Sequence, residues 1–475
     1  MKVLFVTSEV AGLFKLGGLG DVSYALPVAL SKLGVTVSVV LPYYEKIKLK
    51  EVTCVGQLAA DFNRRREIIF VFKSFLPGST VPVYLFRHQL FNNYRSKNIA
   101  DTFSFFSKVV CQFYLYSNQN LGGPYNIVHC HDWHTALVPL LLGEQRKVGN
   151  NQADTLEAKQ VKTIFTIHSH LYSGETGVMT ILQLGLPTSL FHVYDTKSGR
   201  AIKLMREALE YADTITTVSP SYAQELITTE HGNEINEVMK RRADRVVGIL
   251  NGIDQDVWNP QTDKAITAQY GKSDVFVQKA KNKKYVRHAL KLPEKTVPLF
   301  GFIGRLEFRQ KGLDFIEKML AVVPKDQFQL VILGTGSPKS VEKLKKMIQP
   351  YDHVCFINTF DERLARRIYA GADVLLVPSR FEPCGLIQMI AMRYGTLPLV
   401  RKTGGLADSV THLKTGFVFS KYQAKQFIDV IKKAINMYQH QPNVWQKMVQ
   451  TSMRMNFSWV ESAKKYAALY KKLAQ

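Results

Sequence analysis

The chain has 475 residues, enough for two to four domains, and its hydrophobic content of 46% is ample for globular cores. No apolar run reaches the roughly 18 residues of a membrane span, and the short, acidic start of the chain is unlike a signal peptide. The formal net charge of +23 is large, whereas the five cysteines form no C-x-x-C pair or metal-ligand spacing, a pattern typical of reduced thiols in a cytoplasmic protein.

The first half of the chain alternates short apolar runs with amphipathic stretches, which favours a doubly wound, mostly parallel sheet. We expect strands at residues 2–7, 35–41, 68–75, 81–86, 125–130, 162–167 and 214–218, and helices at 102–117, 135–146 and 201–211. The polar, aperiodic stretch 147–159 predicts a surface loop.

A second alternating series begins near residue 297. It predicts strands at 297–303, 329–333, 354–357, 374–377 and 397–400, and helices at 313–322, 338–348, 361–371, 386–394 and 424–438, with a last amphipathic helix at 460–472. Two such series indicate two Rossmann-like α/β domains, residues 1–247 and 248–457. Because ligands of open α/β sheets bind beyond the carboxyl ends of the strands, we expect the two domains to face each other across a deep cleft.

Basic residues cluster at 64–66, 240–245 and 279–287. We interpret them as solvated faces, with attraction of an anionic substrate or of nucleic acid as alternatives. Because the clusters lack the interleaved aromatic residues of a nucleic-acid groove, nucleic acid is the weaker alternative.

A glycine-rich turn follows the first predicted strand. Lys15-Leu16-Gly17-Gly18-Leu19-Gly20-Asp21 stands between an apolar strand and a helical pattern, an arrangement that can bind phosphate because the glycines let a ligand approach the backbone at a helix start. The spacing matches neither the dinucleotide fingerprint nor a Walker motif, so a plain tight turn is an equal alternative.

Histidines gather after two later strands. The first is followed by His131-Asp132-Trp133-His134, in which Asp132 could cap a helix and Trp133 could be a core residue or a platform for a sugar ring. A metal site at His129, His131 and His134 is disfavoured, because they straddle a strand-to-helix turn and lack a second ligand cluster. His168, after strand 162–167, is either a buried residue or one that reaches the cleft.

In the second series, Arg305 at a strand end and Lys311 at a helix start suit a diphosphate, since two fixed cations can neutralise a leaving phosphate group without a metal ion. A surface Arg–Lys pair is the alternative. Three further strand ends carry the turn at Gly334, the loop with Glu382, and the glycine-rich helix start at Thr403-Gly404-Gly405. The pair Asp254 and Asp256 has the form of a metal-binding Asp-x-Asp motif but lies outside any predicted strand end, so we interpret it as structural.

Together these motifs resemble the bacterial glycogen synthases, which are similar to the plant starch synthases of glycosyltransferase family 5, with the GT-B fold. The resemblance runs nearly end to end and is carried by KLGGLGDV, HDWHTAL, TVSPSYAQE, GILNGIDQDVWNPQTD, GRLEFRQKGLD, PSRFEPCGL and YGTLPLVRKTGGLADSV. It implies a retaining, metal-independent transfer of glucose from ADP-glucose to the non-reducing 4-hydroxyl of an α-1,4-glucan such as glycogen. It also implies that the C-terminal helix, 458–475, crosses back to the first domain.

The resemblance assigns roles to residues one by one. It implies catalytic roles for Asp21, His168, Arg305, Lys311 and Glu382. It implies substrate binding by Lys15, Gly17, Gly18, Asp132, Trp133, Asn251, Gly334, Cys384, Gly385, Thr403, Gly404 and Gly405. No metal, cofactor, nucleic acid or membrane is expected to take part, and the sequence carries no signal for an oligomeric state.

Some positions depart from the family pattern. Leu16 replaces a threonine, and the residues after His168 read Ser-His where the family usually has asparagine first. One additional residue separates Arg305 from Lys311, so we expect that loop to bulge. A related enzyme using UDP-glucose, a non-catalytic glucan-binding protein and, less favoured, a nicotinamide-dependent dehydrogenase are the alternatives.

Overall fold

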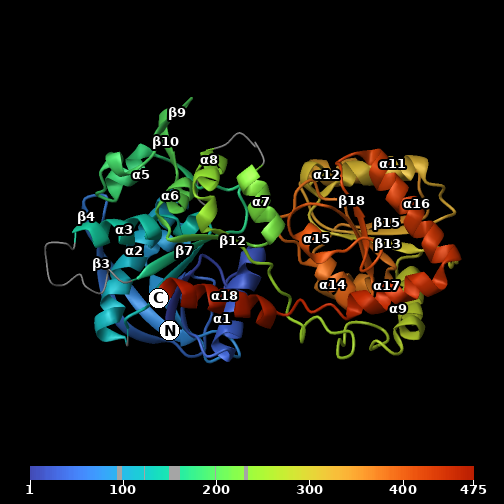
Figure 1. The fold of residues 1–475 in the computed structure, drawn as a ribbon, viewed down its shortest axis with the longest axis horizontal. Coiled ribbons are helices and arrows are strands. Elements are labelled where there is room, and N and C mark those ends of the chain that lie inside the picture. The colour runs from blue at the N-terminus through green and yellow to red at the C-terminus, as the bar shows by residue number, and fades with distance from the viewer. Residues whose placement is uncertain (94–98, 122, 149–160, 198, 229–233) are drawn as a thin grey trace. The chain divides into compact units, whose positions relative to one another are not determined.

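The computed structural model describes residues 1–93, 99–121, 123–148, 161–197, 199–228 and 234–475 (Figure 1). The chain divides into two compact units. Unit 1 comprises Met1–Ile249 together with Trp459–Gln475, and unit 2 comprises Leu250–Ser458. Each unit is a mixed α/β structure built on its own largely parallel sheet, which is the predicted fold class.

The sheet of unit 1 has the strand order β12-β11-β7-β6-β1-β2-β5-β4-β3. Its strands are β1 (Lys2–Val6), β2 (Thr36–Pro42), β3 (Thr53–Phe62), β4 (Arg65–Phe75), β5 (Pro82–Arg87), β6 (Ile127–His131), β7 (Lys162–Ile167), β11 (Thr214–Thr217) and β12 (Val246–Gly248). From β12 to β5 the pairings are parallel, and β4 pairs antiparallel with both β5 and β3. Val3, Leu4 and Phe5 of the central strand β1 are fully buried, as expected of a strand covered on both faces.

The helices of unit 1 connect these strands. They are α1 (Gly18–Lys32), α2 (Ile99–Asn120), α3 (Leu137–Val148), α5 (Val178–Gln183), α6 (Leu204–Tyr211), α7 (Pro220–Thr228), α8 (Glu234–Arg241) and α18 (Trp459–Ala474). The surface loop predicted at 147–159 begins with the last two residues of α3 and otherwise lies outside the described residues.

Unit 1 differs from the sequence-based prediction in several places, among them the short strand β12, which was not predicted. The helix predicted at 201–211 begins only at Leu204, because Gly199–Lys203 forms β10, the middle strand of a small antiparallel sheet with β8 (Glu175–Gly177) and β9 (Tyr194–Thr196). Strand β3 was not predicted. It pairs with β4 through a tight turn at Asn63 and Arg64, whose φ angles are 52° and 60°.

Unit 2 has a parallel sheet of order β15-β14-β13-β16-β17-β18, with every pairing parallel. Its strands are β13 (Leu299–Ile303), β14 (Gln329–Leu333), β15 (Val354–Ile357), β16 (Val374–Val377), β17 (Leu397–Arg401) and β18 (Phe417–Phe419). Its helices are α9 (Val275–Ala289), α10 (Phe308–Lys311), α11 (Leu313–Val322), α12 (Pro338–Ile348), α13 (Glu362–Gly371), α14 (Ile387–Arg393), α15 (Gly404–Ser409), α16 (Ala424–His440) and α17 (Pro442–Met453).

The elements predicted for unit 2 are present with similar bounds, whereas β18, α9 and α17 were not predicted. The local signals of the predicted helices are strong. Ser337 caps α12 by accepting a hydrogen bond from the Ser340 amide, and Pro338 occupies the first helical position. Asp361 caps α13 in the same way through the Leu364 amide. The sequence therefore marks where these two helices begin.

The last helix, α18, packs against α1 in unit 1 (Figure 1). Trp459, Ala463, Tyr466 and Tyr470 of α18 join the hydrophobic core that β1, β2 and α1 share. The Tyr470 hydroxyl also lies 2.7 Å from Nδ1 of His129 in β6. The C-terminal segment is thus an integral part of unit 1.

The basic cluster at 279–287 is not the solvated face that we expected. It lies on α9, where Lys279, Lys283 and Arg287 are each only 8% exposed. Lys279 Nζ donates to Thr396 Oγ1 at 2.6 Å and lies 3.0–3.2 Å from three backbone carbonyls, and Lys283 pairs with Asp373. Spaced four residues apart, these cations form one buried face of the helix, where oxygen acceptors compensate their charge.

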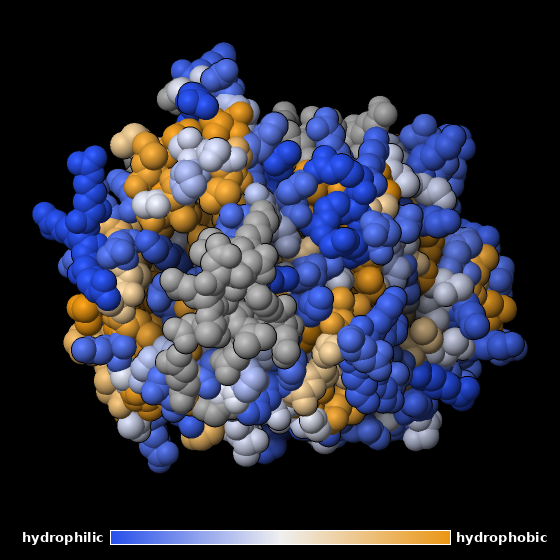
Figure 2. Space-filling view, turned by 60° about the vertical axis from the view of Figure 1, so that its left-hand side comes forward, coloured by the Kyte–Doolittle hydropathy of each residue, from blue (hydrophilic) through white to orange (hydrophobic). Residues whose placement is uncertain are grey.

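In the described part of the chain, no helix is both long and apolar enough to cross a membrane. Figure 2 shows hydrophilic residues spread over the visible face, with hydrophobic patches between them.

Candidate active site

In unit 1, the glycine-rich turn lies directly beyond the end of β1. The buried carboxylate of Glu9 accepts hydrogen bonds from the backbone amides of Leu16 and Gly17, the latter at 2.9 Å. An internal carboxylate therefore already occupies two of the amides that we expected to meet phosphate. At Gly18, the first residue of α1, an added Cβ would meet nothing within 4 Å, so a ligand can approach the backbone there.

Lys15 and Asp21 flank this turn and pair with each other. Lys15 Nζ lies 2.6 Å from Asp21 Oδ1, and the two side chains are 43% and 39% exposed. Such an exposed pair contributes little to stability, on the order of 0–1 kcal/mol. Lys15 can exchange this partner for an anionic ligand at small cost.

The ends of β6 and β7 bring Asp132 and His168 together. Asp132 Oδ1 accepts a hydrogen bond of 2.7 Å from the His168 amide, and Asp132 has a φ angle of 54°, which only a fixed turn imposes on a non-glycine residue. Burial raises the pKa of the Asp132 carboxyl to about 7, against the backbone hydrogen bonds from His168 and Ser169 that lower it. Asp132 thus acts on the backbone that positions His168.

The side chain of His168 is neutral and is bonded to a second histidine. His168 Nε2 lies 3.0 Å from His131 Nδ1, and the His131 ring is fully buried and stacks on Phe5 with centroids 4.0 Å apart. Burial lowers the pKa of His168 to about 3 and holds that of His131 well below its usual value. At neutral pH the pair presents hydrogen-bonding groups without charge.

The other histidines of β6 and the following turn do not form a metal site. His129 bonds to the hydroxyls of Tyr470 and Thr166, and burial lowers the pKa values of His129 and His134 to about 3. Among the described residues, no group of three histidine, cysteine or acidic side chains is placed to hold a metal ion.

Trp133 is packed against its own unit. Its ring stacks on His134 with centroids 4.2 Å apart and meets Phe103 edge-on at 5.4 Å. A Cβ at Gly174, whose φ is +68°, would lie 2.5 Å from the indole, so this glycine is needed for the close approach. Trp133 is partly buried, and protein already covers much of its ring.

In unit 2, Lys311 and Glu382 form a largely buried ion pair. Lys311 Nζ lies 2.7 Å from Glu382 Oε2, the side chains are 17% and 12% exposed, and the Ser379 hydroxyl donates to the same oxygen at 2.9 Å. Two segments far apart in sequence, at 304–311 and 378–386, are thereby tied together. Between Arg305 and Lys311 the chain forms the short helix α10 (Phe308–Lys311), whose C-cap is Gly312 with a φ of +74°.

Arg305 is the exposed cation of this group. Its guanidinium donates to Gln310 Oε1 at 3.3 Å, and it has no carboxylate partner among the described residues. Gly334 follows β14 and packs against the turn before Arg305: a Cβ there would lie 1.9 Å from the Gly304 carbonyl oxygen. Gly334 therefore shapes the backbone that presents Arg305.

The glycine-rich start of α15 packs directly on the loop that carries Glu382. The Gly405 amide lies 3.1–3.2 Å from the carbonyls of Glu382 and Pro383, and added Cβ atoms at Gly404 and Gly405 would lie 2.0 and 2.2 Å from backbone oxygens. Here the glycines permit contact between two backbones. Thr403, the N-cap residue of α15, is buried.

Three further predicted residues surround this loop. Cys384 is buried, and burial raises the pKa of its thiol to about 12, so it is not a nucleophile at neutral pH. Gly385 has a φ of +69° and its carbonyl accepts from Gln388. Asn251 is 6% exposed, and its Oδ1 has no hydrogen-bond partner in the described part of the chain, which leaves an acceptor available in a buried place.

The Asp254 carboxylate of the Asp-x-Asp segment bonds to its own turn. Asp254 Oδ1 accepts hydrogen bonds from the amides of Asp256 and Val257, at 3.0 and 3.1 Å. This is the self-capping turn that aspartate favours, and it uses the carboxylate that a metal would need.

The predicted residues fall into two groups, one in each unit. Unit 1 holds Lys15, Gly17, Gly18, Asp21, Asp132, Trp133 and His168, and unit 2 holds Asn251, Arg305, Lys311, Gly334, Glu382, Cys384, Gly385, Thr403, Gly404 and Gly405. Sequence reasoning missed Glu9, which occupies the turn amides, and Ser379, which supports Glu382; it considered His131 only as a metal ligand. Glu9 could have been found from the sequence, because it is an acidic residue that closely follows the predicted first strand, where site residues are expected.

Comparisons with known proteins agree on one family. Residues 2–241 match the family described as starch synthase catalytic domain, and residues 286–450 match glycosyl transferases group 1. The glycogen synthases of Clostridium novyi and Pseudothermotoga lettingae are each 36% identical, over 99% of this chain and 98% of theirs. The catalytic domain of starch synthase IV from Arabidopsis thaliana, solved with ADP and acarbose, has a TM-score of 0.86 and 31% identity, and the match covers 99% of both chains.

Proposed function

We propose the donor, acceptor and residue roles of this chain from the premise that it belongs to the bacterial glycogen synthase family of glucosyltransferases. The proposed reaction transfers glucose from ADP-glucose to the 4-hydroxyl group at the non-reducing end of an α-1,4-glucan, with retention of the anomeric configuration. The Arabidopsis starch synthase of similar structure was solved with ADP and with acarbose. That complex supports an adenine nucleotide on the donor side and an oligosaccharide on the acceptor side.

The observation that carries the proposal is the charged cluster of unit 2. Arg305 is exposed and has no carboxylate partner in the part of the chain that the structure describes, and Lys311 is held by Glu382 next to the glycine-rich start of α15. In the proposed role, Arg305 and Lys311 stabilise the negative charge that develops on the diphosphate as it leaves. Fixed positive charges in a site that excludes water are worth several kcal/mol, about 2.7–4 for a single donor.

Glu382 has two tasks in this proposal. Its Oε2 accepts from Lys311 and Ser379, which fixes the carboxylate, and its second oxygen is then oriented toward hydroxyls of the donor glucose. A carboxylate accepts two such bonds and so distinguishes a sugar from other phosphate esters. Asn251 would contribute its unpartnered Oδ1, and Gly334, Cys384, Gly385 and Thr403–Gly405 would contribute shape and backbone groups.

In unit 1, the proposed contacts to the sugar and acceptor are mostly uncharged. His168 would bond a glucose hydroxyl, and Asp132 would fix the His168 backbone. Lys15 would leave Asp21 to meet the nucleotide sugar at the open backbone of Gly18. Gly17 would keep its amide on Glu9, which holds the turn in place, and Trp133 would line the acceptor side.

We propose that the anomeric configuration is retained without a covalent intermediate. Glu382 is not proposed to act with a second carboxylate as in a retaining glycosidase, and the residue eight positions after it is Ile390. The acceptor hydroxyl would therefore attack on the face from which ADP departs, and its proton would pass to the leaving phosphate oxygen. No step calls for a metal ion or another cofactor.

Transfer of radiolabelled glucose into glycogen tests this function directly. With EDTA present, ADP-glucose should give label in the polymer, and UDP-glucose should give a much lower rate at equal concentration. Faster transfer from UDP-glucose than from ADP-glucose would make UDP-glucose the donor, as in the alternative enzyme. No transfer from either donor would favour the non-catalytic alternative.

A further inference from the structure

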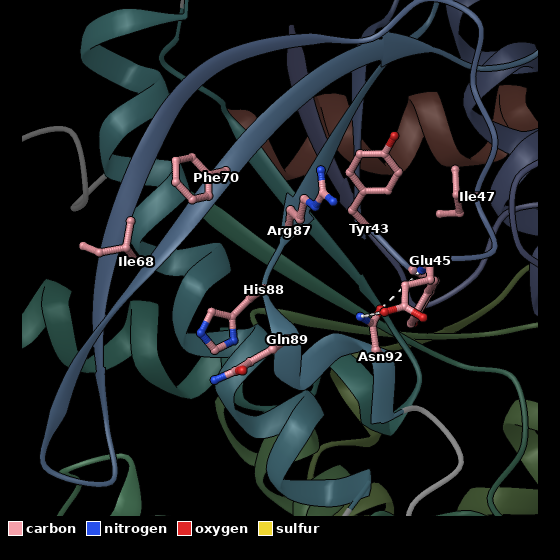
Figure 3. Close-up of a pocket in the computed structure, with 10 residues that line it drawn as sticks. Tyr43, Glu45, Ile47, Ile68, Phe70, Arg87, His88, Gln89 and Asn92 are labelled. Carbon is pink, nitrogen blue, oxygen red and sulfur yellow. Dashed lines mark hydrogen bonds between the residues drawn. The ribbon is translucent and has the colours of Figure 1, made fainter.

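Two hollows of the structure lie at opposite edges of their sheets. One, of about 620 Å³, lies beyond the ends of β2 and β5 in unit 1, where Asn92 Nδ2 donates to Glu45 Oε1 at 2.6 Å (Figure 3). It shares the carboxyl edge of its sheet with the predicted site residues of unit 1. The other, of about 310 Å³, lies within unit 2 among α9, α16, α17 and the residues that precede β16 and β17.

The hollow of unit 2 lies away from the predicted site residues. Asp373 and Gly395, which line it, precede β16 and β17, whereas Glu382 and Thr403 follow these two strands. We call this hollow the amino-edge pocket. Because β16 has four residues and a strand rises about 3.3 Å per residue, the pocket lies roughly 15 Å from the carboxyl edge of the sheet. A ligand there would not displace a diphosphate at the other edge.

Three aromatic side chains line the amino-edge pocket, each from a different helix. Phe276 of α9 is partly buried and contacts no other aromatic ring among the described residues. Trp445 of α17 is 8% exposed, and its ring meets that of Tyr438 in α16 edge-on, with centroids 5.2 Å apart. Such walls favour a flat ring, which aromatic side chains contact by stacking or edge-on.

The two lysines of the pocket have no N–H group left for a ligand. Lys283 Nζ donates to the Tyr438 hydroxyl at 2.8 Å and to a backbone carbonyl at 3.0 Å, and it pairs with Asp373 Oδ2 at 2.5 Å. Lys279 Nζ has four oxygen acceptors within its own unit, one more than its three N–H groups. Because a bound phosphate or carboxylate needs such donors, an anionic ligand is disfavoured here.

Two polar groups of the pocket remain available, one acceptor and one donor. Asp373 Oδ2 accepts from the Leu299 amide and pairs with Lys283, whereas Oδ1 has no hydrogen-bond partner among the described residues. The Tyr438 hydroxyl accepts from Lys283, so its own proton has no acceptor in the described part of the chain. Burial raises the pKa of this phenol, which keeps the proton in place. Since both groups bond the same Lys283 Nζ, one ring edge can reach both.

These groups define the chemistry of a ligand. It is a flat ring with an N–H donor beside an acceptor on one edge, and it is uncharged, because Lys283 already balances the charge of Asp373. The amino groups of adenine and cytosine stand next to a ring nitrogen that accepts hydrogen bonds, which is the required pattern.

We propose that the amino-edge pocket is a ligand site separate from the proposed donor site, and that it binds an uncharged, amino-substituted ring of the nucleobase class. The amino group would donate to Asp373 Oδ1, and the adjacent ring nitrogen would accept from the Tyr438 hydroxyl. The ring would lie between these groups and the side chains of Phe276 and Trp445. This inference goes beyond the proposed function and does not rest on it.

Calorimetric titration of the full chain with 9-methyladenine tests the ligand class. The methyl group removes the N–H donor on the far side of the base, so only the amino edge offers a donor. Wild type should bind this probe with a Kd of about 1 mM or below, as a ring of this size permits. The N6,N6-dimethyl derivative of the probe lacks the amino N–H and should bind at least tenfold more weakly.

Ala280→Leu tests the place of binding. Ala280 is exposed on α9 and lines the pocket, so a leucine fills space without removing a hydrogen bond. It should weaken binding of 9-methyladenine at least tenfold. The matched control is Ala289→Leu: Ala289 is exposed at the end of the same helix and does not line the pocket, so Kd should stay within twofold. Both variants should unfold within a few degrees of wild type.

Tyr438→Phe tests the polar edge alone. It removes the O–H donor and keeps the ring, and should weaken binding of 9-methyladenine about five- to tenfold. The comparison of the probe with its dimethyl derivative uses wild type only, so it decides the matter even if a variant folds poorly.

Three results would overturn the proposal. The first is a wild-type chain that gives no binding of 9-methyladenine at millimolar concentration. The second is equal affinity for the probe and its dimethyl derivative, which would exclude the bond to Asp373. The third is binding to folded Ala280→Leu as tight as to wild type, which would place the probe at another site, such as the proposed donor site.

Discussion

The two units bury their basic groups in opposite ways. In unit 1 they are histidines: His129, His131 and His168 lie among aromatic rings and threonine hydroxyls, and burial keeps their pKa values far below neutral. In unit 2 they include two lysines, Lys279 and Lys311, which each lie among oxygen acceptors. Around the predicted site, unit 1 thus offers neutral hydrogen-bonding groups, which suit a sugar, and unit 2 offers the cations Arg305 and Lys311, which suit a diphosphate.

The largest effect should come from removing a cation of unit 2. Arg305→Ala should lower kcat about 10²- to 10³-fold, because the guanidinium is proposed to stabilise charge that appears only in the transition state. Arg305→Lys should recover part of the loss, since it keeps the charge without the planar geometry. Steady-state rates with glycogen decide the matter, and activity of Arg305→Ala within a few-fold of wild type would remove Arg305 from the site.

Removing the neutral group of unit 1 should have a smaller effect. His168→Ala should lower kcat about 10- to 100-fold, because a hydrogen-bonding partner of the sugar lost in a closed site costs about 1–3 kcal/mol. His168→Gln, which retains a polar end, should be less impaired.

The pH profile separates a neutral His168 from a charged one. With its pKa lowered to about 3, His168 stays neutral throughout pH 5–8 and should add no inflection to kcat/KM in that range. If the wild-type profile has an inflection near pH 6.5 and His168→Gln abolishes it, His168 carries charge in that range. This result would contradict the assignment of neutral groups to unit 1.

Lys279 tests how unit 2 tolerates a buried amine. Lys279→Met should destabilise α9 and α13 by about 1–3 kcal/mol at pH 7, because the Lys279 amine no longer satisfies the carbonyls of Tyr369 and Ala370. Native-state hydrogen exchange of these helices measures the loss.

The pH dependence of that loss has a defined sign. Burial lowers the pKa of Lys279 to about 7, whereas the unfolded chain keeps a value near 10.4, so between these values the unfolded state binds more protons. Stability of the wild type relative to Lys279→Met should therefore rise from pH 7 to pH 9, by up to about 1.4 kcal/mol per pH unit. A gap that is constant or shrinks over this range would mean that the buried amine keeps its proton.

The smallest effect is expected outside both groups. Asp256→Ala should leave kcat and the response to added manganese within twofold of wild type, because Asp254 accepts the backbone bonds that hold this turn and no metal is proposed there. A large loss that manganese relieves would make the Asp-x-Asp segment a metal site after all.

Sequence reasoning worked best where local signals and burial agree. The strands of unit 2 are continuous apolar runs and its helices carry caps such as Ser337 and Asp361, so their bounds were nearly correct. In unit 1, β3 was missed because its exposed edge shows no clear apolar alternation. Residues 201–203 were assigned to a helix because Ala201 and Ile202, buried through pairing with β8, continue an apolar pattern into α6.

The site was predictable as a set of positions at strand ends, but its pairings were not. Arg305, Lys311 and Glu382 could be selected by residue type and place, whereas the bond between Lys311 and Glu382 joins residues 71 positions apart. The basic cluster on α9 was misread because charge alone does not show that Lys279 and Lys283 meet acceptors from other elements. Likewise, the sequence pattern does not predict that Phe70 remains exposed.

Calorimetric titration of ADP in the presence of EDTA tests the division between the units most directly. Wild type would be compared with Lys311→Met and with His168→Ala. The control is the double variant that combines Lys311→Met with Glu382→Gln, because it leaves no unpaired carboxylate. The account predicts that both Lys311 variants bind ADP at least tenfold more weakly than wild type, and that His168→Ala binds ADP within twofold. Equal losses in the Lys311 and His168 variants, or ADP binding that requires a divalent cation, would contradict it.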